Sequence, residues 1–271
     1  MANDITLSSA VRTNLLALNR TQDLINRTQE RLATGLEVSS PIDDATAFFE
    51  AKALSDRALD LDERKTGIDQ GISAITTALN AIESIDTLVR QMEGLAISAK
   101  TATGNQLSAI KTQFDELLSQ ITNLANDASY QGTNLVNSTA TELEIAFSTD
   151  TVSKLVVQGF DLTTAGLNIT TAGAFSLSTV LDARLTEIDA ALSTLRGQAQ
   201  SIGSNVALLQ ARLDFTESYV NDHEAGAGKL TLADWNEEGA NLVALQTRQQ
   251  LGVSALSFAG QAEQSILRLF Q

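Results

Sequence analysis

The stretch from Ala45 to Ala99, which contains no proline, constrains this chain most. Apolar residues recur through it at helical spacing, and its three glycines are isolated. A helix of about 55 residues is about 80 Å long at 1.5 Å per residue. Because that length far exceeds a compact domain, the sequence predicts a long-helix bundle.

Apolar periodicity also predicts helices before and after this stretch. One ends at Gly35, one covers about residues 106–128, one begins near Val180, and the last runs from about Asp234 to the C-terminus. We expect the fourth of these five helices to break at Gly226 and Gly228. One proline in 271 residues agrees with a chain dominated by helix.

Two short segments interrupt the helical pattern. Residues 142–148 alternate apolar and polar side chains, and residues 154–160 are rich in residues that favour strands. The predicted fold is therefore mainly α, a long-helix coiled-coil bundle with a small β-hairpin segment at mid-chain, which we expect at the far tip of the bundle. The expected domains are an inner coiled-coil helix (1–40), long rod helices (41–141), a small β segment of the rod (142–178), a returning rod helix (179–233) and a second inner helix (234–271).

The break between the first two helices has its own signals. Gly35 suits the left-handed position that closes a helix. Ser40 then reads as an N-cap, Pro41 as the first helical residue, and Asp43 as the partner in a capping box. Asp43 and Asp44 also lie where a helix dipole favours negative charge, so we interpret them as caps and not as metal ligands.

The two terminal helices share a spacing near 3.5 residues, which is typical of a coiled coil. Polar residues Gln22, Gln29 and Gln249 occupy some of the expected seam positions and should weaken an isolated pair. The expected coiled-coil core consists of Val11, Leu15, Leu18, Ile25, Leu32, Leu242, Leu245, Leu256, Ile266 and Phe270. An ordinary amphipathic helix packing within its own domain is the alternative for the first of these helices.

Charge is distributed unevenly. The chain carries −15, residues 1–35 and 241–271 each sum to +1, and the remainder carries −17. An acidic middle argues against binding of nucleic acid or anionic membrane, because both need a basic face. The charge-poor ends suggest segments that become buried.

The sequence offers little chemistry. It has no cysteine, which excludes disulfides and thiolate sites, and one histidine, His223, which we expect to be an exposed loop residue. No phosphate-binding loop or nucleophile motif is present, so we expect no cofactor, no metal and no enzymatic activity. No run is long and apolar enough for a membrane span, and the first residues do not resemble a cleavable signal peptide.

Three stretches together resemble bacterial flagellin, the filament subunit. They are LNRTQDLINRTQERLATGLEVSSPIDDA (18–45), ISAITTALNAIESIDTLVRQMEGLAISA (72–99) and LQTRQQLGVSALSFAGQAEQSILRLF (245–270), and YQGTNL (130–135) also matches. The resemblance covers about two thirds of the chain, in the right order. With only a short β segment at mid-chain, the sequence resembles a minimal flagellin that lacks large outer domains.

The resemblance implies a function and partners. The chain would self-assemble into a tubular flagellar filament outside the cell, with its terminal helices lining the central channel. It would be exported unfolded through the flagellar type III apparatus, and a chaperone would bind its C-terminal helix. Other flagellins, hook-associated proteins and cap proteins would be further partners.

One departure from the family concerns innate immunity. In flagellins sensed by a vertebrate receptor (Toll-like receptor 5), an arginine precedes Glu-Leu-Ala in the second long-helix motif. Here the matching stretch is Glu93-Gly94-Leu95-Ala96, and a glutamate of the same patch aligns with Gln113. Reversed charge at an interface centre costs several kcal/mol, so we expect weak or absent receptor activation.

Other functions remain as alternatives. A hook–filament junction protein shares the terminal helices, although the match in the central helices favours the filament subunit. A type III secreted coiled-coil translocator or a signalling coiled coil would show an apolar membrane segment or an adaptor hairpin, and neither pattern is found. An enzyme is the weakest alternative.

Overall fold

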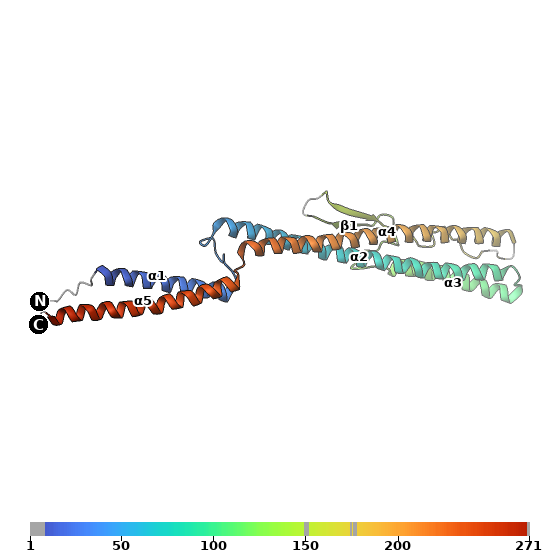
Figure 1. Cartoon of the computed structure of the whole chain (residues 1–271). Helices are drawn as coiled ribbons and strands as arrows, with labels where there is room; N and C mark the ends of the chain where they lie inside the picture. Colours follow the sequence, from blue (N-terminus) through green and yellow to red (C-terminus); the bar gives the residue numbers. More distant parts are fainter. Residues whose placement is uncertain (1–8, 149–151, 174, 176–177, 270–271) are drawn as a thin grey trace. The chain divides into compact units, whose positions relative to one another are not determined.

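The computed structural model describes residues 9–148, 152–173, 175 and 178–269. Within them the predicted mainly α fold with a small β-hairpin at mid-chain is confirmed (Figure 1). The elements are α1 (Ser9–Thr34), α2 (Ala45–Ala99), α3 (Gly104–Asp127), β1 (Glu142–Ala146), β2 (Lys154–Gln158), α4 (Ser178–Thr231) and α5 (Trp235–Leu269). The helix expected from Ala45 to Ala99 has those bounds.

The chain divides into two compact units. We call residues 1–56 with 222–271 the terminal unit, and residues 57–221 the central unit. The terminal unit contains α1 and α5 together with the adjoining ends of α2 and α4. The central unit contains the rest of α2 and α4, all of α3, and the hairpin.

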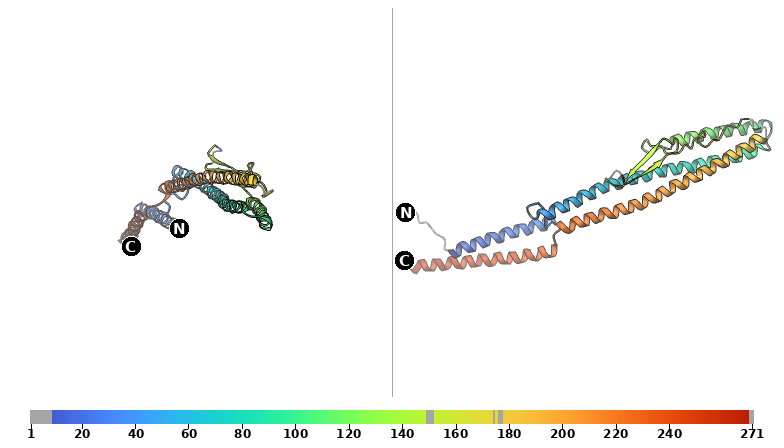
Figure 2. Two further views of the ribbon diagram at one scale, coloured as in Figure 1. Left: turned by 90° about the vertical axis from the view of Figure 1, so that its right-hand side faces the viewer. Right: turned by 90° about the horizontal axis from the view of Figure 1, so that it is seen from above.

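The core of the central unit is aliphatic and formed by three helices. Figure 2 shows α2, α3 and α4 running side by side in this unit. Each helix contributes one apolar stripe at three- and four-residue spacing, as expected for helices that bury one face. Fully or nearly fully buried members include Ile68, Ile75, Ile82, Ile85, Val89 and Met92 from α2, Phe114 and Ile121 from α3, and Ile188, Leu195, Ile202 and Leu209 from α4.

A tight turn and one asparagine close the end of α3. Tyr130 and Thr133 exchange both backbone hydrogen bonds, at 2.9 Å each, around Gln131 and Gly132, whose φ angles are 49° and 84°. Positive φ at both central positions is the pattern of a type I′ turn, and it explains the glycine. The Asn134 amide then donates to the carbonyls of Ala125 and Asn126, and its oxygen accepts from two backbone amides that follow.

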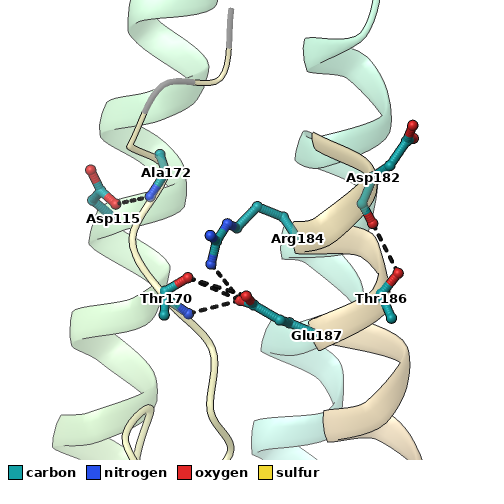
Figure 3. Close-up of polar contacts among 7 residues, drawn as sticks. All are labelled: Asp115, Thr170, Ala172, Asp182, Arg184, Thr186 and Glu187. Atoms are coloured by element: carbon teal, nitrogen blue, oxygen red, sulfur yellow. Dashed lines mark hydrogen bonds and ion pairs between the residues drawn. The ribbon is translucent and has the colours of Figure 1, made fainter. Parts of the chain in front are cut away.

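Residues 160–173, which we call the strap, cover the central core between β2 and α4. The strap buries Leu162, Leu167 and Ile169 against the helices. Two carboxylates from different helices fix it, as Figure 3 shows: Asp115 of α3 accepts from the Ala172 amide, and Glu187 of α4 accepts from the backbone and hydroxyl of Thr170. Arg184 also donates to Glu187.

The hairpin lies away from the bundle tip, so the expectation that placed it there is wrong. Its strands pair antiparallel, with Ile145 opposite Leu155, and Ile145 lies directly over Gly71 of α2. At Gly71 an added Cβ would come within 2.4 Å of the isoleucine side chain, which accounts for the glycine. The tip is instead the turn between α2 and α3, where Lys100 pairs with Asp182 at 2.9 Å.

Two expected helix boundaries are also corrected. Residues 41–43 form a turn and α2 begins at Ala45, so Pro41 is not its first residue and Ser40 is not its N-cap. Helix α4 does not break at Gly226 or Gly228 but continues to Thr231. Gly226 packs closely on Leu54, whose Cδ1 would lie 3.3 Å from an added Cβ, so this glycine allows close helix approach.

Replacement of Asn134 should destabilise the central unit. Asn134→Ala leaves two carbonyls and two amides without the partners they have in the native fold, at a cost of about 2 kcal/mol in the free energy of unfolding. Urea denaturation of the monomer measures this change. Asn80→Ala, on the exposed face of α2, is the matched control and should cost nothing.

Acid should loosen the strap. Partial burial opposes ionisation of Glu187, but hydrogen bonds from Arg184 and Thr170 outweigh it and hold the pKa of Glu187 below its usual value of 4.5. A lowered native pKa gives stability that is present above the unfolded pKa and is lost as pH falls through the native pKa. Hydrogen-exchange protection of the Thr170 amide should therefore decline below about pH 4.5.

The variant Glu187→Gln separates this effect from general acid unfolding. It should show reduced Thr170 protection at neutral pH and little further pH dependence. Asp182→Asn removes a more exposed carboxylate from the same helix and should behave like the native chain. Equal protection in all three proteins would contradict the prediction.

Candidate functional site

Helices α1 and α5 of the terminal unit form an antiparallel pair, and their Cα atoms approach within 8 Å (Figure 1). Later residues of α1 contact earlier residues of α5, as expected for an antiparallel pair. Arg31 bonds Glu238 at 2.7 Å, Gln249 donates to Gln22 at 2.6 Å, and an added Cβ on Gly252 would lie 2.9 Å from Leu18. This helix pair is the candidate functional site.

The seam between the two helices follows a strict alternation of three- and four-residue steps. Its buried or half-buried positions are Val11, Asn14, Leu18, Thr21, Ile25, Thr28 and Leu32 on α1, and Glu238, Leu242, Leu245, Gln249, Gly252, Leu256 and Ala259 on α5. Half of these side chains are polar or small. Polar residues at seam positions reduce the stability of a coiled coil, so this pair is weak on its own.

The structure places the predicted core residues unequally. Val11 and Ile25 are buried, and Leu18, Leu32, Leu242, Leu245 and Leu256 are half-buried in the seam. Leu15 is 41% exposed and is not one of the seam positions. Ile266 belongs to α5, but its side chain is outside the described part of the structure, and Phe270 lies outside the described residues.

The seam register within one chain differs from the expectation. Asn14, Thr21 and Thr28 occupy the positions that we gave to Leu15, Gln22 and Gln29. Both threonines are 7% exposed, and the Thr21 hydroxyl donates to the Ala17 carbonyl, which satisfies it within its own helix. Both registers alternate steps of three and four residues from Val11, so spacing alone could not choose between them.

The side of α5 opposite the seam is almost without charge and exposes three large apolar side chains. Val243, Leu251 and Phe258 are 63%, 65% and 70% exposed. Between Glu238 and Glu263 the helix has a single charged residue, Arg248. Exposed apolar surface of this extent on a helix usually marks a contact with another protein.

The two chain breaks of the terminal unit are hydrogen-bonded to each other. Gly35 has φ 74° and donates to the Arg31 carbonyl at 2.8 Å, which closes α1. Leu36 and Leu232 form an antiparallel bridge, in which Glu37 donates to Thr231 and Ala233 donates to Gly35. The ends of α1 and α4 are thus fixed side by side within this unit.

Asp43 and Asp44 lie in the segment between α1 and α2, which we call the joint, and their role there is structural. The Asp43 carboxylate accepts from the backbone and hydroxyl groups of Ser39 and Ser40, and these bonds, led by the Ser40 hydroxyl, lower the pKa of Asp43. Asp44 accepts from the amides of residues 46 and 47 and is the N-cap of α2. Asp43 therefore reaches back to Ser40, although outside the helix.

An ion cluster at the joint was missed from the sequence. Arg31 pairs with Glu238 at 2.7 Å and with Glu37 at 3.4 Å, and the Glu238 side chain is only 8% exposed. The Trp235 ring lies 3.7 Å from the position of a Cβ on Gly35. Because Arg31 and Glu238 are distant in sequence, only the pairing of α1 with α5 reveals them.

Three of the four residues predicted for an innate-receptor patch lie together in the central unit. Gly94 and Leu95 of α2 and Gln113 of α3 line a hollow of about 620 Å³ between these helices. Glu93 is half-buried on α2 and does not line it. Gln91 and Gln120 line the hollow together with Gln113.

Histidine and acidic residues form no site in the described part of the chain, where no group of three or more His, Asp or Glu side chains could hold a metal ion. His223 lies within α4 and is half-buried, so its placement in an exposed loop was wrong. The helix continues through this region instead of breaking. Among the described residues no helix is apolar and long enough to cross a membrane.

Comparison with known proteins gives a consistent result. The bacterial flagellin N-terminal helical region matches residues 5–141, and the C-terminal helical region matches residues 185–270. Flagellin FljM of Caulobacter vibrioides is 34% identical, with 99% of each chain covered, and a flagellin of Brucella melitensis is 30% identical over the full length of both chains. The structure of a flagellar hook-associated protein from Vibrio parahaemolyticus is similar in fold, with a TM-score of 0.60, 13% identity, and coverage of 70% of this chain and 100% of the other.

Loss of the Arg31 side chain should open the helix pair. Arg31→Met leaves the buried Glu238 carboxylate without its cation, which should cost about 2 kcal/mol in the free energy of local opening. Hydrogen exchange of α1 amides near Thr28 measures it. Arg20→Met, which removes an exposed arginine from the same helix, should leave exchange unchanged, and equal effects of both variants would contradict the assignment.

Proposed function

The chain belongs to the bacterial flagellin family, and we propose that it is a structural subunit of the bacterial flagellar filament, an extracellular helical tube that serves swimming motility. The observation that supports this function most directly is the uncharged apolar side of α5, with Val243, Leu251 and Phe258 exposed. One copy of the chain covers only the seam side of this helix. Burial of the other side therefore requires further copies.

Assembly would bury the charge-poor residues 1–35 and 241–271 and leave the acidic middle of the chain outside. We assign residues 1–40 and 234–271 to the inner coiled coil, 41–141 and 179–233 to the rod helices, and 142–178 to a small β segment of the rod. Gly35, Ser40, Pro41, Asp43 and Asp44 form the joint between them. Contacts between unlike faces of successive copies extend into a helical filament, whereas a two-fold contact would stop at a dimer.

The ten predicted coiled-coil residues take two roles in this proposal. The residues in the α1–α5 seam hold the pair within one subunit. Leu15 lies outside the seam positions and is exposed enough to contact a neighbouring copy. Because the seam itself is polar, neighbouring copies would supply much of the stability that one pair lacks.

Further partners follow from the family resemblance. We propose export of the unfolded chain through the flagellar type III apparatus, with a chaperone that binds the C-terminal helix. The exposed apolar side chains of α5 suit such a chaperone, because they would otherwise promote aggregation before export. Other flagellins, hook-associated proteins and cap proteins are the remaining proposed partners.

Other functions have less support. A hook–filament junction protein would share the terminal helices, but the two matched family regions describe flagellins. The likeness to the hook-associated protein concerns fold alone. Flagellins are structural proteins, and we propose no enzymatic activity and no cofactor for this chain.

Electron microscopy after nucleation tests the proposal directly. The purified chain should form long tubes of uniform diameter. Leu251→Lys places a charge among the exposed apolar side chains of α5 and should abolish or strongly reduce tube formation, while Asn80→Lys, at an exposed position of α2 in the central unit, should have little effect. Absence of tubes from the native chain under all nucleating conditions would refute the function.

The terminal helices should be loosely ordered in the monomer and ordered in the filament. Their polar seam gives a weak pair, and assembly would cover both helices. Hydrogen exchange should show low protection of residues 9–34 in monomers and high protection in filaments. Full protection of this segment in the monomer would contradict the prediction.

Innate-receptor activation should be weak. Glu93 stands where activating family members have arginine, and Gln113 replaces a glutamate, so two charge contacts would be altered. A reporter-cell assay with purified monomer measures potency. The double variant Glu93→Arg, Gln113→Glu should gain activity, and full potency of the native chain would exclude this interpretation.

A further inference from the structure

The side of α1 that faces away from α5 presents three arginines, Arg12, Arg20 and Arg27, which we call the arginine face. At 100° per residue they lie within about 80° of one another, opposite the seam that contains Leu18 and Ile25. Arg20 and Arg27 are seven residues apart, which places them about 10 Å apart along the helix axis. All three side chains are exposed.

None of the three arginines forms an ion pair with another described residue. Arg31 on the same helix, by contrast, forms ion pairs with Glu238 and Glu37. Asp23 lies close to Arg20 and Arg27, beside an open hollow of about 380 Å³ that these three residues line with Leu24, yet it makes no salt bridge with either. Among the described residues, the arginine face therefore makes no salt bridge.

The charge of the chain shows what would compensate it. Residues 36–240 carry −17, whereas residues 1–35 sum to +1. A second copy of this chain thus offers many carboxylates to any cation that its neighbour exposes. Arginine binds carboxylates through a planar fork that can donate two parallel hydrogen bonds, which gives geometric specificity as well as attraction.

We propose that the arginine face binds carboxylates of a second copy of this chain, as a contact between neighbouring subunits. The inference rests on the proposed filament function and names a contact surface within it. Leu16 lies among the arginines and is 61% exposed, so the same face offers an apolar contact at its centre. The two sides of the helix pair would then differ: α5 contributes apolar contacts, and α1 contributes ion pairs.

The contact has a salt dependence that apolar contacts lack. Ion pairs between exposed groups weaken as the Debye length falls from about 30 Å at 0.01 M salt to about 8 Å at 0.15 M. Such pairs also accelerate association of complementary surfaces. The elongation rate of seeded filaments should therefore fall with added salt in the native chain.

The test compares two double variants that each remove two positive charges. Arg20→Gln with Arg27→Gln alters the arginine face, and Lys111→Gln with Lys229→Gln alters two lysines elsewhere that also lack an ion pair among the described residues. Circular dichroism first checks that all monomers have equal helix content. We expect elongation about tenfold slower and nearly independent of salt for the arginine variant, and within about twofold of the native rate for the lysine variant.

Each other outcome rejects the proposal in a distinguishable way. If the native chain forms no filaments, the proposed function fails and this contact fails with it. If the native chain and the arginine variant elongate equally, filament function stands and the contact is wrong. If both double variants slow equally, net charge is responsible and not the arginine face.

Binding to lipid vesicles tests whether an anionic membrane, and not a second copy of the chain, binds the arginine face. The native monomer is mixed with vesicles of phosphatidylcholine containing phosphatidylglycerol, and binding is measured by co-sedimentation. We expect no binding beyond that of the arginine variant. Binding that depends on Arg20 and Arg27, together with unchanged elongation, would assign the face to an anionic lipid surface and overturn the proposal.

Discussion

The terminal unit depends on the antiparallel seam between α1 and α5, and that seam is made weak by its own residues. Thr21, Thr28 and Gly252 allow the backbones to approach closely but bury little apolar surface. A pair of this kind gains less from its own packing than an aliphatic seam would. Contacts made by the other sides of α1 and α5 therefore contribute more to the stability of this pair than they would in an ordinary coiled coil.

The central unit has the opposite character. Its three helices bury a continuous aliphatic core, and the strap and the hairpin cover that core with further apolar side chains. Polar anchors such as Asn134 and Glu187 fix the irregular segments by hydrogen bonds to backbone groups. The apolar core of this unit is thus covered by elements of the unit itself, whereas the proposed assembly contacts lie in the terminal unit.

Much of the fold could be predicted because its helices follow simple periodicity, and α2 has the predicted bounds. The seam register was harder, because we gave Leu15 the position that Asn14 occupies. Both registers fit a heptad, and the apolar leucine favoured the wrong one. The glycines near residue 226 suggested a break, but packing against Leu54 offsets their poor helix propensity. The Arg31–Glu238 ion pair could not be predicted, because a local sequence pattern does not show which helices pack against each other.

Trp235 is the single tryptophan of the chain, and it lies against Gly35 at the point where the two breaks of the terminal unit are bridged. It is 64% exposed, so its indole emission in the isolated chain originates from one hydrated position. The chain thus contains its own optical probe of the joint. Emission wavelength and quenching would follow the environment of Gly35 and Leu232 in real time, without any added label.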